Sequence, residues 1–196
     1  LSKLSTTGTA SSANFLRGDG AWSTAGTFKL IKEINVSNVA SVSFVNGTSD
    51  VVFDTTYKVY FLTLTNVLMA SDSELFLRAL SNGSSLTTGY YAMQVGTLSN
   101  NTAYNDIYQN AFFGSPGSVE STKPLSGYVY FYNAGGTSIY PQAMGQIQME
   151  RDNGNKYGLN FSSLYNTSIS NFNGFILTNN GGGNISSGNL KLYGVI

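Results

Sequence analysis

The sequence has no cysteine and no histidine among its 196 residues. Disulfides, metal sites built on cysteine or histidine, and the usual nucleophile–base pairs of hydrolases are therefore excluded. Charge is scarce as well: 10% of residues are Asp, Glu, Lys or Arg, against about 25% in ordinary soluble domains. The net charge is zero, so the chain lacks the basic footprint of a nucleic-acid-binding protein. No apolar run approaches the ~20 residues of a membrane span. We therefore expect neither a nucleic-acid partner nor membrane insertion.

Hydrophobic residues make up 41% of the chain, which is ample for a core. From residue 28 onward, short β-branched and aromatic runs alternate with clusters of Gly, Asn and Ser, and no segment keeps a 3.6-residue period for three turns. Ten runs are candidate strands: 28–36, 39–45, 57–69, 74–80, 90–98, 127–134, 143–151, 157–165, 172–178 and 189–196. This pattern predicts an all-β fold, a two-sheet antiparallel β-sandwich that is jelly-roll-like, with an extended N-terminal arm.

Turns and strand faces can also be predicted. Asn153-Gly154 lies between two strand-like runs and predicts a two-residue hairpin turn, and LSNGSS at 80–85 predicts a second. The run YKVYFLTL at 57–64 is apolar on both faces, which is typical of a central strand covered on each side. The stripe of alternate tyrosines at 128–132 has an apolar opposite face, so we expect it to pack in the core or at a subunit interface.

Residues 1–27 form an arm rich in Ser, Thr, Gly and Ala, which cannot bury enough surface to fold alone. We expect it to be a linker, or to become ordered against neighbours, with residues 28–196 as a head domain. The arm contains an RGD tripeptide whose flanking glycine and apolar residues favour a structural turn over an adhesion ligand. A phosphate loop is excluded because it needs more glycines and a following helix. The expected turn and its anchors are Phe15, Leu16, Arg17, Gly18, Asp19, Gly20 and Trp22.

The stretch 99–124 lacks clean alternation, which predicts a long loop, and it is rich in aromatics and amides. Loops of this length are usually functional or disordered, and disordered loops are poor in aromatics. A sugar presents apolar C–H faces ringed by hydroxyls, which tyrosine and planar amides can match. The candidate receptor-binding or glycan-binding residues are Tyr104, Asn105, Asp106, Tyr108 and Asn110. Inter-subunit contact and plain solvation of the loop remain alternatives for these residues.

Catalysis would have to use carboxylates. Asp72 with Glu74, and Glu150 with Asp152, have the i,i+2 spacing that places both groups on one strand face. A solvated strand end explains both pairs equally well, and neither has a supporting base. We therefore expect no catalytic residue, no cofactor and no metal site, although oxygen-rich loops such as RDNGN could hold calcium.

The stretch TTGTASSANFLRGDGAWST at 6–24 resembles the GTASSxxFLRGDGxW linkers of bacteriophage tail fibres and related virion proteins. The runs YKVYFLTLTNV, ELFLRALSNGS and SSGNLKLYGVI resemble head domains of marine phage structural proteins. The resemblance spans nearly the whole chain, and the linker motif is its more specific part.

This resemblance implies a virion appendage: a tail-fibre tip that forms a homotrimer, contacts other virion proteins and attaches to a host-cell surface receptor. A bacterial surface glycan, bound without catalysis and with avidity from many copies, is the expected receptor. The alternative is a capsid or tail decoration protein that binds other virion proteins and no host receptor.

Overall fold

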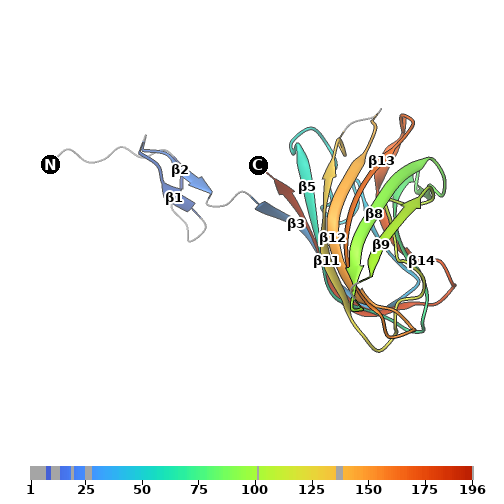
Figure 1. The fold of residues 1–196 in the computed structure, drawn as a ribbon. Coiled ribbons are helices and arrows are strands. Elements are labelled where there is room, and N and C mark those ends of the chain that lie inside the picture. Colours follow the sequence, from blue (N-terminus) through green and yellow to red (C-terminus); the bar gives the residue numbers. More distant parts are fainter. Residues whose placement is uncertain are drawn as a thin grey trace.

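The computed structural model describes residues 8–9, 14–18, 20–24, 28–100, 102–135 and 139–195. Within these residues every regular element is a β-strand and every strand pair is antiparallel. Two sheets, one of eight strands and one of five, form the body of the molecule (Figure 1). The all-β fold and the two-sheet antiparallel sandwich are thus confirmed. The jelly-roll description and the extended arm stay predictions. Among the described residues there is no helix with the length and apolar character to cross a membrane.

All ten expected strands are present, with ends shifted by a few residues, and five short ones join them. The strands are β1 Asn14–Leu16, β2 Trp22–Thr24, β3 Phe28–Val39, β4 Ser41–Val45, β5 Val59–Met69, β6 Leu75–Ser81, β7 Ser84–Ser85, β8 Tyr90–Leu98, β9 Ala103–Tyr108, β10 Phe113–Gly114, β11 Leu125–Tyr132, β12 Gln142–Glu150, β13 Lys156–Tyr165, β14 Phe172–Asn179 and β15 Ile185–Val195. The large sheet has the order β3-β15-β5-β11-β12-β13-β8-β9. The small sheet has the order β10-β6-β14-β4, with β7 paired to β6.

Both predicted hairpins form. Asn82 and Gly83, with φ of 50° and 77°, connect β6 to β7 as a two-residue turn of the primed type. In the β12–β13 hairpin the Arg151 amide donates to the Asn155 carbonyl at 2.9 Å, so the loop has three residues and ends at Gly154 in the left-handed region. The loop is therefore one residue longer than predicted.

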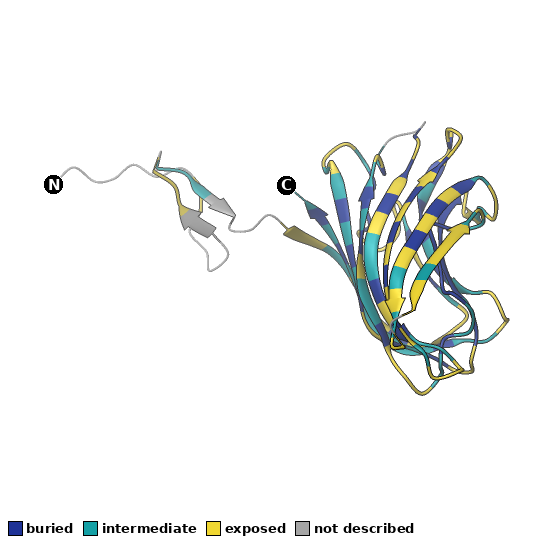
Figure 2. Cartoon of the chain, viewed as in Figure 1, coloured by how far each residue is buried: buried dark blue, intermediate teal, exposed yellow. Residues whose placement is uncertain are grey.

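The core lies between the two sheets and is dominated by aromatic rings. Phe131 of the large sheet stacks on Phe175 of the small sheet, with ring centroids 3.7 Å apart. Burial alternates strictly along β13, where the odd-numbered residues are buried and the even-numbered ones exposed. The same alternation is visible along the neighbouring strands (Figure 2). The large sheet therefore has one face against the core and one facing outward.

The outward face corrects two expectations. Tyr60, Leu62 and Leu64 of β5 are buried, but Phe61 on the opposite face is only partly buried, and no second layer of described residues covers it. The tyrosine stripe of β11 lies on this same outward face, and Tyr128 is 38% exposed. The core half of that prediction is wrong because Val129 and Phe131, not the tyrosines, face the small sheet. The subunit-interface half stays a prediction.

The arm contains a short hairpin in which β1 pairs with β2 and Leu16 is opposite Trp22. The Arg17 amide donates to the Ala21 carbonyl at 2.8 Å, and the Gly20 amide donates to the Arg17 carbonyl at 2.9 Å. Gly20 has a φ of 82°, which a side chain would disfavour. The RGD tripeptide thus lies in the turn of this hairpin. Asp19 itself and the Phe15 side chain lie outside the described structure.

Candidate functional site: a polar groove on the large sheet

Residues 99–124 are not one long loop. They contain β9, which is the edge strand of the large sheet, and β10. The loop prediction is wrong because β9 carries polar residues on both faces, so its sequence lacks the pattern of a half-buried strand. The predicted site residues are consequently divided between two faces: Tyr104, Asp106 and Tyr108 alternate with the outward Asn105.

The two tyrosines of β9 serve as internal supports. Tyr104 packs against the core and meets the buried Tyr157 edge to face, with ring centroids 5.5 Å apart. Its hydroxyl donates to the Asp106 carboxylate at 2.9 Å, and the Tyr108 hydroxyl donates to the Ser115 carbonyl at 3.1 Å. Burial, with the hydrogen bonds to Tyr108 and Asp106 adding to it, raises the pKa of Tyr104 well above its usual range. These hydroxyls are therefore partly engaged within the protein.

Asn110 follows β9 and faces inward. Its backbone carbonyl accepts a hydrogen bond of 2.8 Å from the Arg78 guanidinium, which also lies over the Phe76 ring at 4.5 Å from the centroid. The Asn110 side-chain oxygen is buried and has no partner among the described residues. The five candidate residues are close in sequence, but the structure does not gather them around a single hollow.

A different set of residues lines a hollow on the described surface. Two depressions, of about 510 and about 390 Å³, share Ser126 and Gln148 and form one groove on the outward face of the large sheet. We call it the polar groove. It crosses β5, β11, β12, β13 and β8, a span of about 19 Å at the usual strand spacing. The residues that line it and are used below are Tyr128, Gln146, Ser126, Gln148, Gly158, Thr97, Glu150 and Lys156.

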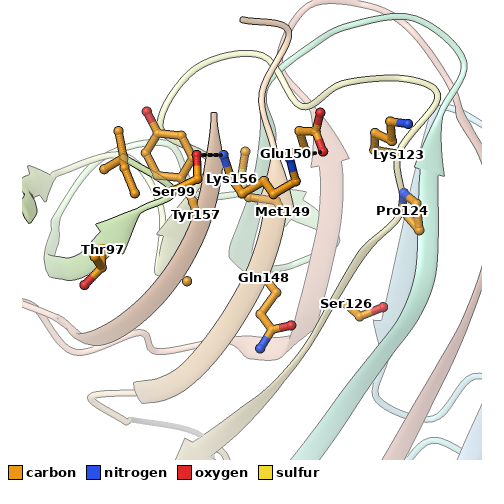
Figure 3. Close-up of a pocket in the computed structure, with 12 residues that line it drawn as sticks. Thr97, Ser99, Lys123, Pro124, Ser126, Gln148, Met149, Glu150, Lys156 and Tyr157 are labelled. Carbon is orange, nitrogen blue, oxygen red and sulfur yellow. Dashed lines mark hydrogen bonds and ion pairs between the residues drawn. The ribbon is translucent and has the colours of Figure 1, made fainter. Parts of the chain in front are cut away.

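The floor of the groove exists because one position has no side chain. Gln148, Gly158 and Thr97 are directly opposite one another on β12, β13 and β8. All three lie on the outward face, and no described atom lies within 4 Å of the point where a Gly158 side chain would begin. Gln148 and Thr97 therefore form walls around a strip of bare backbone. Figure 3 shows the Gln148 amide on its strand with Ser126 on the strand beside it.

The polar chemistry of the groove is neutral at its centre and charged at one end. Among the described residues the Gln148 side-chain amide has no hydrogen-bond partner, whereas Gln146 donates to Asn160 at 3.3 Å. At the end formed by the β12–β13 hairpin, the Lys156 ammonium lies 3.5 Å from the Glu150 carboxylate. The Lys156 backbone amide also donates to the Ser99 hydroxyl at 3.3 Å, as Figure 3 shows. The groove thus offers amides, hydroxyls and one partly exposed ion pair.

An aromatic ring stands at the other end. Tyr128 is 38% exposed, and its ring contacts the rings of Phe61 and Tyr130 on the same face, with centroid distances of 6.0 and 5.8 Å. A ring fixed in this way presents an apolar face next to the Gln146 and Gln148 amides. An aromatic face beside planar amides is the pairing that sugar rings require.

The carboxylate pairs have separate partners. Asp72 accepts from the Ser121 amide at 2.8 Å, and the hydrogen bonds from Ser121 lower its pKa. Glu74 accepts from the Asn180 amide at 3.0 Å. Asp152 lies 3.9 Å from Arg151, while Glu150 belongs to the groove. In the described parts of the chain no cluster of three or more acidic side chains could hold a metal ion.

The sequence pattern predicts the strands of the groove but not the groove itself. Alternation shows which residues of β12 and β13 face outward, but their alignment across strands depends on the order β11-β12-β13-β8. The hairpin signal at Asn153-Gly154 makes β12 and β13 neighbours, but a two-residue loop would place Leu159 opposite Gln148. The third loop residue shifts the register and places Gly158 there. No comparable signal predicts that β8 follows β13.

No protein-family model, curated protein or solved structure matches this chain.

Proposed function

We propose that this chain is the tip of a phage tail fibre and that it attaches to a bacterial surface glycan through the polar groove, without catalysis. The observation that carries this proposal is the groove itself, in which an exposed aromatic ring, the Gln148 amide without a partner among the described residues, and hydroxyls surround bare backbone. The side chains stand on five paired strands, which hold them more rigidly than a loop would.

The chemistry of the groove suits a polyhydroxylated ligand. Gln148 can both donate and accept hydrogen bonds, and Thr97 adds a hydroxyl. Tyr128 can stack on the C–H face of a sugar ring. The groove is shallow and open, which suits a chain of linked sugars better than a small molecule that needs enclosure.

The arm motif supports the assignment to a virion. The GTASS and FLRGDG elements resemble tail-fibre linkers, and the RGD turn lies within the β1–β2 hairpin. The proposal therefore includes location in the virion, a homotrimer and contacts with other virion proteins. The alternative, a capsid or tail decoration protein, is favoured by the uncovered apolar residues on the outward face of the large sheet.

The absence of catalysis is part of the proposal. Glu150 is the one predicted carboxylate in the groove, and it is paired with the Lys156 ammonium. A glycosidase needs two carboxyl groups that flank one sugar bond, and Asp152 interacts with Arg151 instead. We expect that neither the parent protein nor Glu150→Gln cleaves surface polysaccharide. Sugar release that the parent protein supports and Glu150→Gln abolishes would make the chain an enzyme.

The test adds a side chain at Gly158, on the floor of the groove. In Gly158→Val a branched side chain enters the open space, and the fold should tolerate it because Val is favoured in strands. We expect binding of fluorescently labelled protein to susceptible bacteria to fall about tenfold or more, equivalent to about 1.4 kcal/mol. Ser43→Val, on an exposed position of β4 in the other sheet, is the matched control and should bind as the parent does.

A Gly158→Val protein that is folded and binds as well as the parent would contradict the groove as the receptor site. Tyr104→Phe and Tyr108→Phe then test the original candidates, because they remove hydroxyls and leave the packed rings in place. If the parent binds no susceptible host but binds purified virions, the decoration role replaces attachment.

A further inference from the structure

The outward face of the large sheet carries a continuous band of apolar side chains. Strand register aligns one row across all eight strands and a second row beside it. The first row is Leu30, Tyr193, Phe61, Tyr130, Met144, Ser162, Met93 and Ile107. The second row is Phe28, Val195, Val59, Tyr132, Gln142, Leu164 and Tyr91. We call these two rows the apolar band, and all members except Ser162 and Gln142 are apolar or aromatic.

Several neighbouring apolar residues of the band are exposed together. Ile107 is 68% exposed, Met93 and Tyr91 are each 55% exposed, and Met144 is 47% exposed. The two rows, of eight and seven residues, cover roughly 500 Å², taking strand spacings of about 4.8 Å and alternate residues about 7 Å apart. This is as large as the largest apolar patch of a typical monomer, and such patches usually mark interaction sites.

Charge is confined to the other part of the same face. Glu33 and Lys191 form an ion pair of 3.4 Å on β3 and β15, one row beyond the band. Glu150 and Lys156 pair in the polar groove. No band residue carries a formal charge, and the whole chain has a net charge of zero. Two identical bands can therefore approach each other without electrostatic repulsion.

The two halves of the band are chemically different and suit each other. The half on β3, β15, β5 and β11 is a cluster of rings: the Phe61 centroid lies 4.6 Å from that of Tyr130, 5.1 Å from Phe28 and 6.0 Å from Tyr193. The half on β12, β13, β8 and β9 contains Met144 and Met93, and Tyr91 is its single ring. Thioether sulfur makes favourable contacts with aromatic rings, and unbranched methionine adapts to their shape.

We infer that the apolar band is covered by a second copy of this chain, with the aromatic half of one copy packed on the methionine half of the next. Two copies that each bury about 500 Å² would reach the ~1,000 Å² total expected of a specific interface. A two-fold dimer pairs both halves of each band at one interface, whereas a closed ring pairs each half with a different neighbour and buries about half of that area at each contact. This inference rests on the proposed homo-oligomer and names the surface that assembles it. Glycan attachment is tested separately, through the polar groove.

The test measures the mass of the full chain in solution by sedimentation velocity over a range of concentrations. The parent protein should be larger than one chain, and Met144→Glu should raise the dissociation constant about thirtyfold or more, because a carboxylate becomes buried without a partner. Val52→Glu is the control: Val52 is 40% exposed but lies outside the band, so this variant should keep the parent mass. Thermal unfolding followed by circular dichroism checks that each variant is folded.

A second pair of variants tests the arrangement even if Met144→Glu fails to fold. Leu30→Lys and Ile107→Glu change the two residues at the ends of the first row, both of which are exposed. Each alone should dissociate, and an equimolar mixture should regain mass because opposite charges then meet. No recovery on mixing would overturn the pairing of unlike halves. A parent protein that sediments as a single chain at every concentration would overturn the inference.

Discussion

Gly117 and Gly158 show opposite consequences of a missing side chain. Gly117 has a φ of 102°, and a methyl group there would meet the Arg151 guanidinium. Gly158 has ordinary strand geometry and open space above it. The first glycine is required by the fold, whereas the second leaves room that only a ligand could use.

We therefore predict that Gly117→Ala lowers the free energy of unfolding by about 2 kcal/mol, through an unfavourable φ and displacement of Arg151. Gly158→Ala should change stability by no more than about 0.5 kcal/mol, or raise it slightly. Urea denaturation of both variants measures the difference. Equal stability of the two would show that the segment around Gly117 moves aside at no cost.

Tyr60 predicts how the protein responds to alkaline pH. Burial raises the pKa of its hydroxyl to about 12, while the hydroxyl donates to the Asp54 carbonyl at 3.1 Å and accepts from the Asp54 amide at 2.9 Å. In the unfolded chain the pKa is about 10, so the unfolded state loses its proton first. The stabilisation is fully present below pH 10 and is lost as the pH rises from 10 to about 12.

The measurement is the midpoint of thermal unfolding of Tyr60→Phe and of the parent between pH 8 and 12. The variant should be less stable by about 1 kcal/mol at pH 8, because the Asp54 amide loses its acceptor. It should also lose less stability on going to high pH. If the two curves remain parallel throughout, ionisation of Tyr60 does not drive alkaline unfolding.

At the scale of the element, β9 shows where sequence patterns stop being informative. Strands such as β13 were predictable because apolar and polar residues alternate strictly along them. In β9 the inward side carries Asp106, which remains exposed at the sheet edge, and the outward side carries the apolar Ile107. An edge strand that covers only part of the core does not need full alternation. The one local signal was the Asx turn before it, in which the Thr102 amide donates to Asn100.

The two sides of β9 should respond differently to truncation. Tyr104→Ala should lower the free energy of unfolding by about 2 kcal/mol. The substitution removes a half-buried ring, and the buried Tyr157 then loses its edge-to-face partner. Asn105→Ala, one residue later and outward, should stay within about 0.5 kcal/mol of the parent. Denaturant titration provides both values. Loss of cell binding by Asn105→Ala without loss of stability would restore this strand as a receptor contact.

At the scale of the whole molecule, sequence patterns predict the strands but not their neighbours. Hairpin signals join β12 to β13 and β6 to β7. By contrast, β15 lies between β3 and β5, which are both far from it in sequence. Both the polar groove and the apolar band depend on such long-range order. Their residues were visible in the sequence as outward-facing positions, and only the fold joins them into surfaces.

The strands of the arm do not belong to either the large sheet or the small sheet. Among the described residues β1 and β2 pair only with each other. Residues 28–196 should therefore unfold within about 2 °C of the full chain, since a change of about 1 kcal/mol shifts the unfolding midpoint of a domain of this size by about 2–4 °C. If the apolar band drives self-association, the shortened chain should also keep the sedimentation mass expected for the same number of copies. A shortened chain that is equally stable but monomeric would move the subunit contact from the band to the arm.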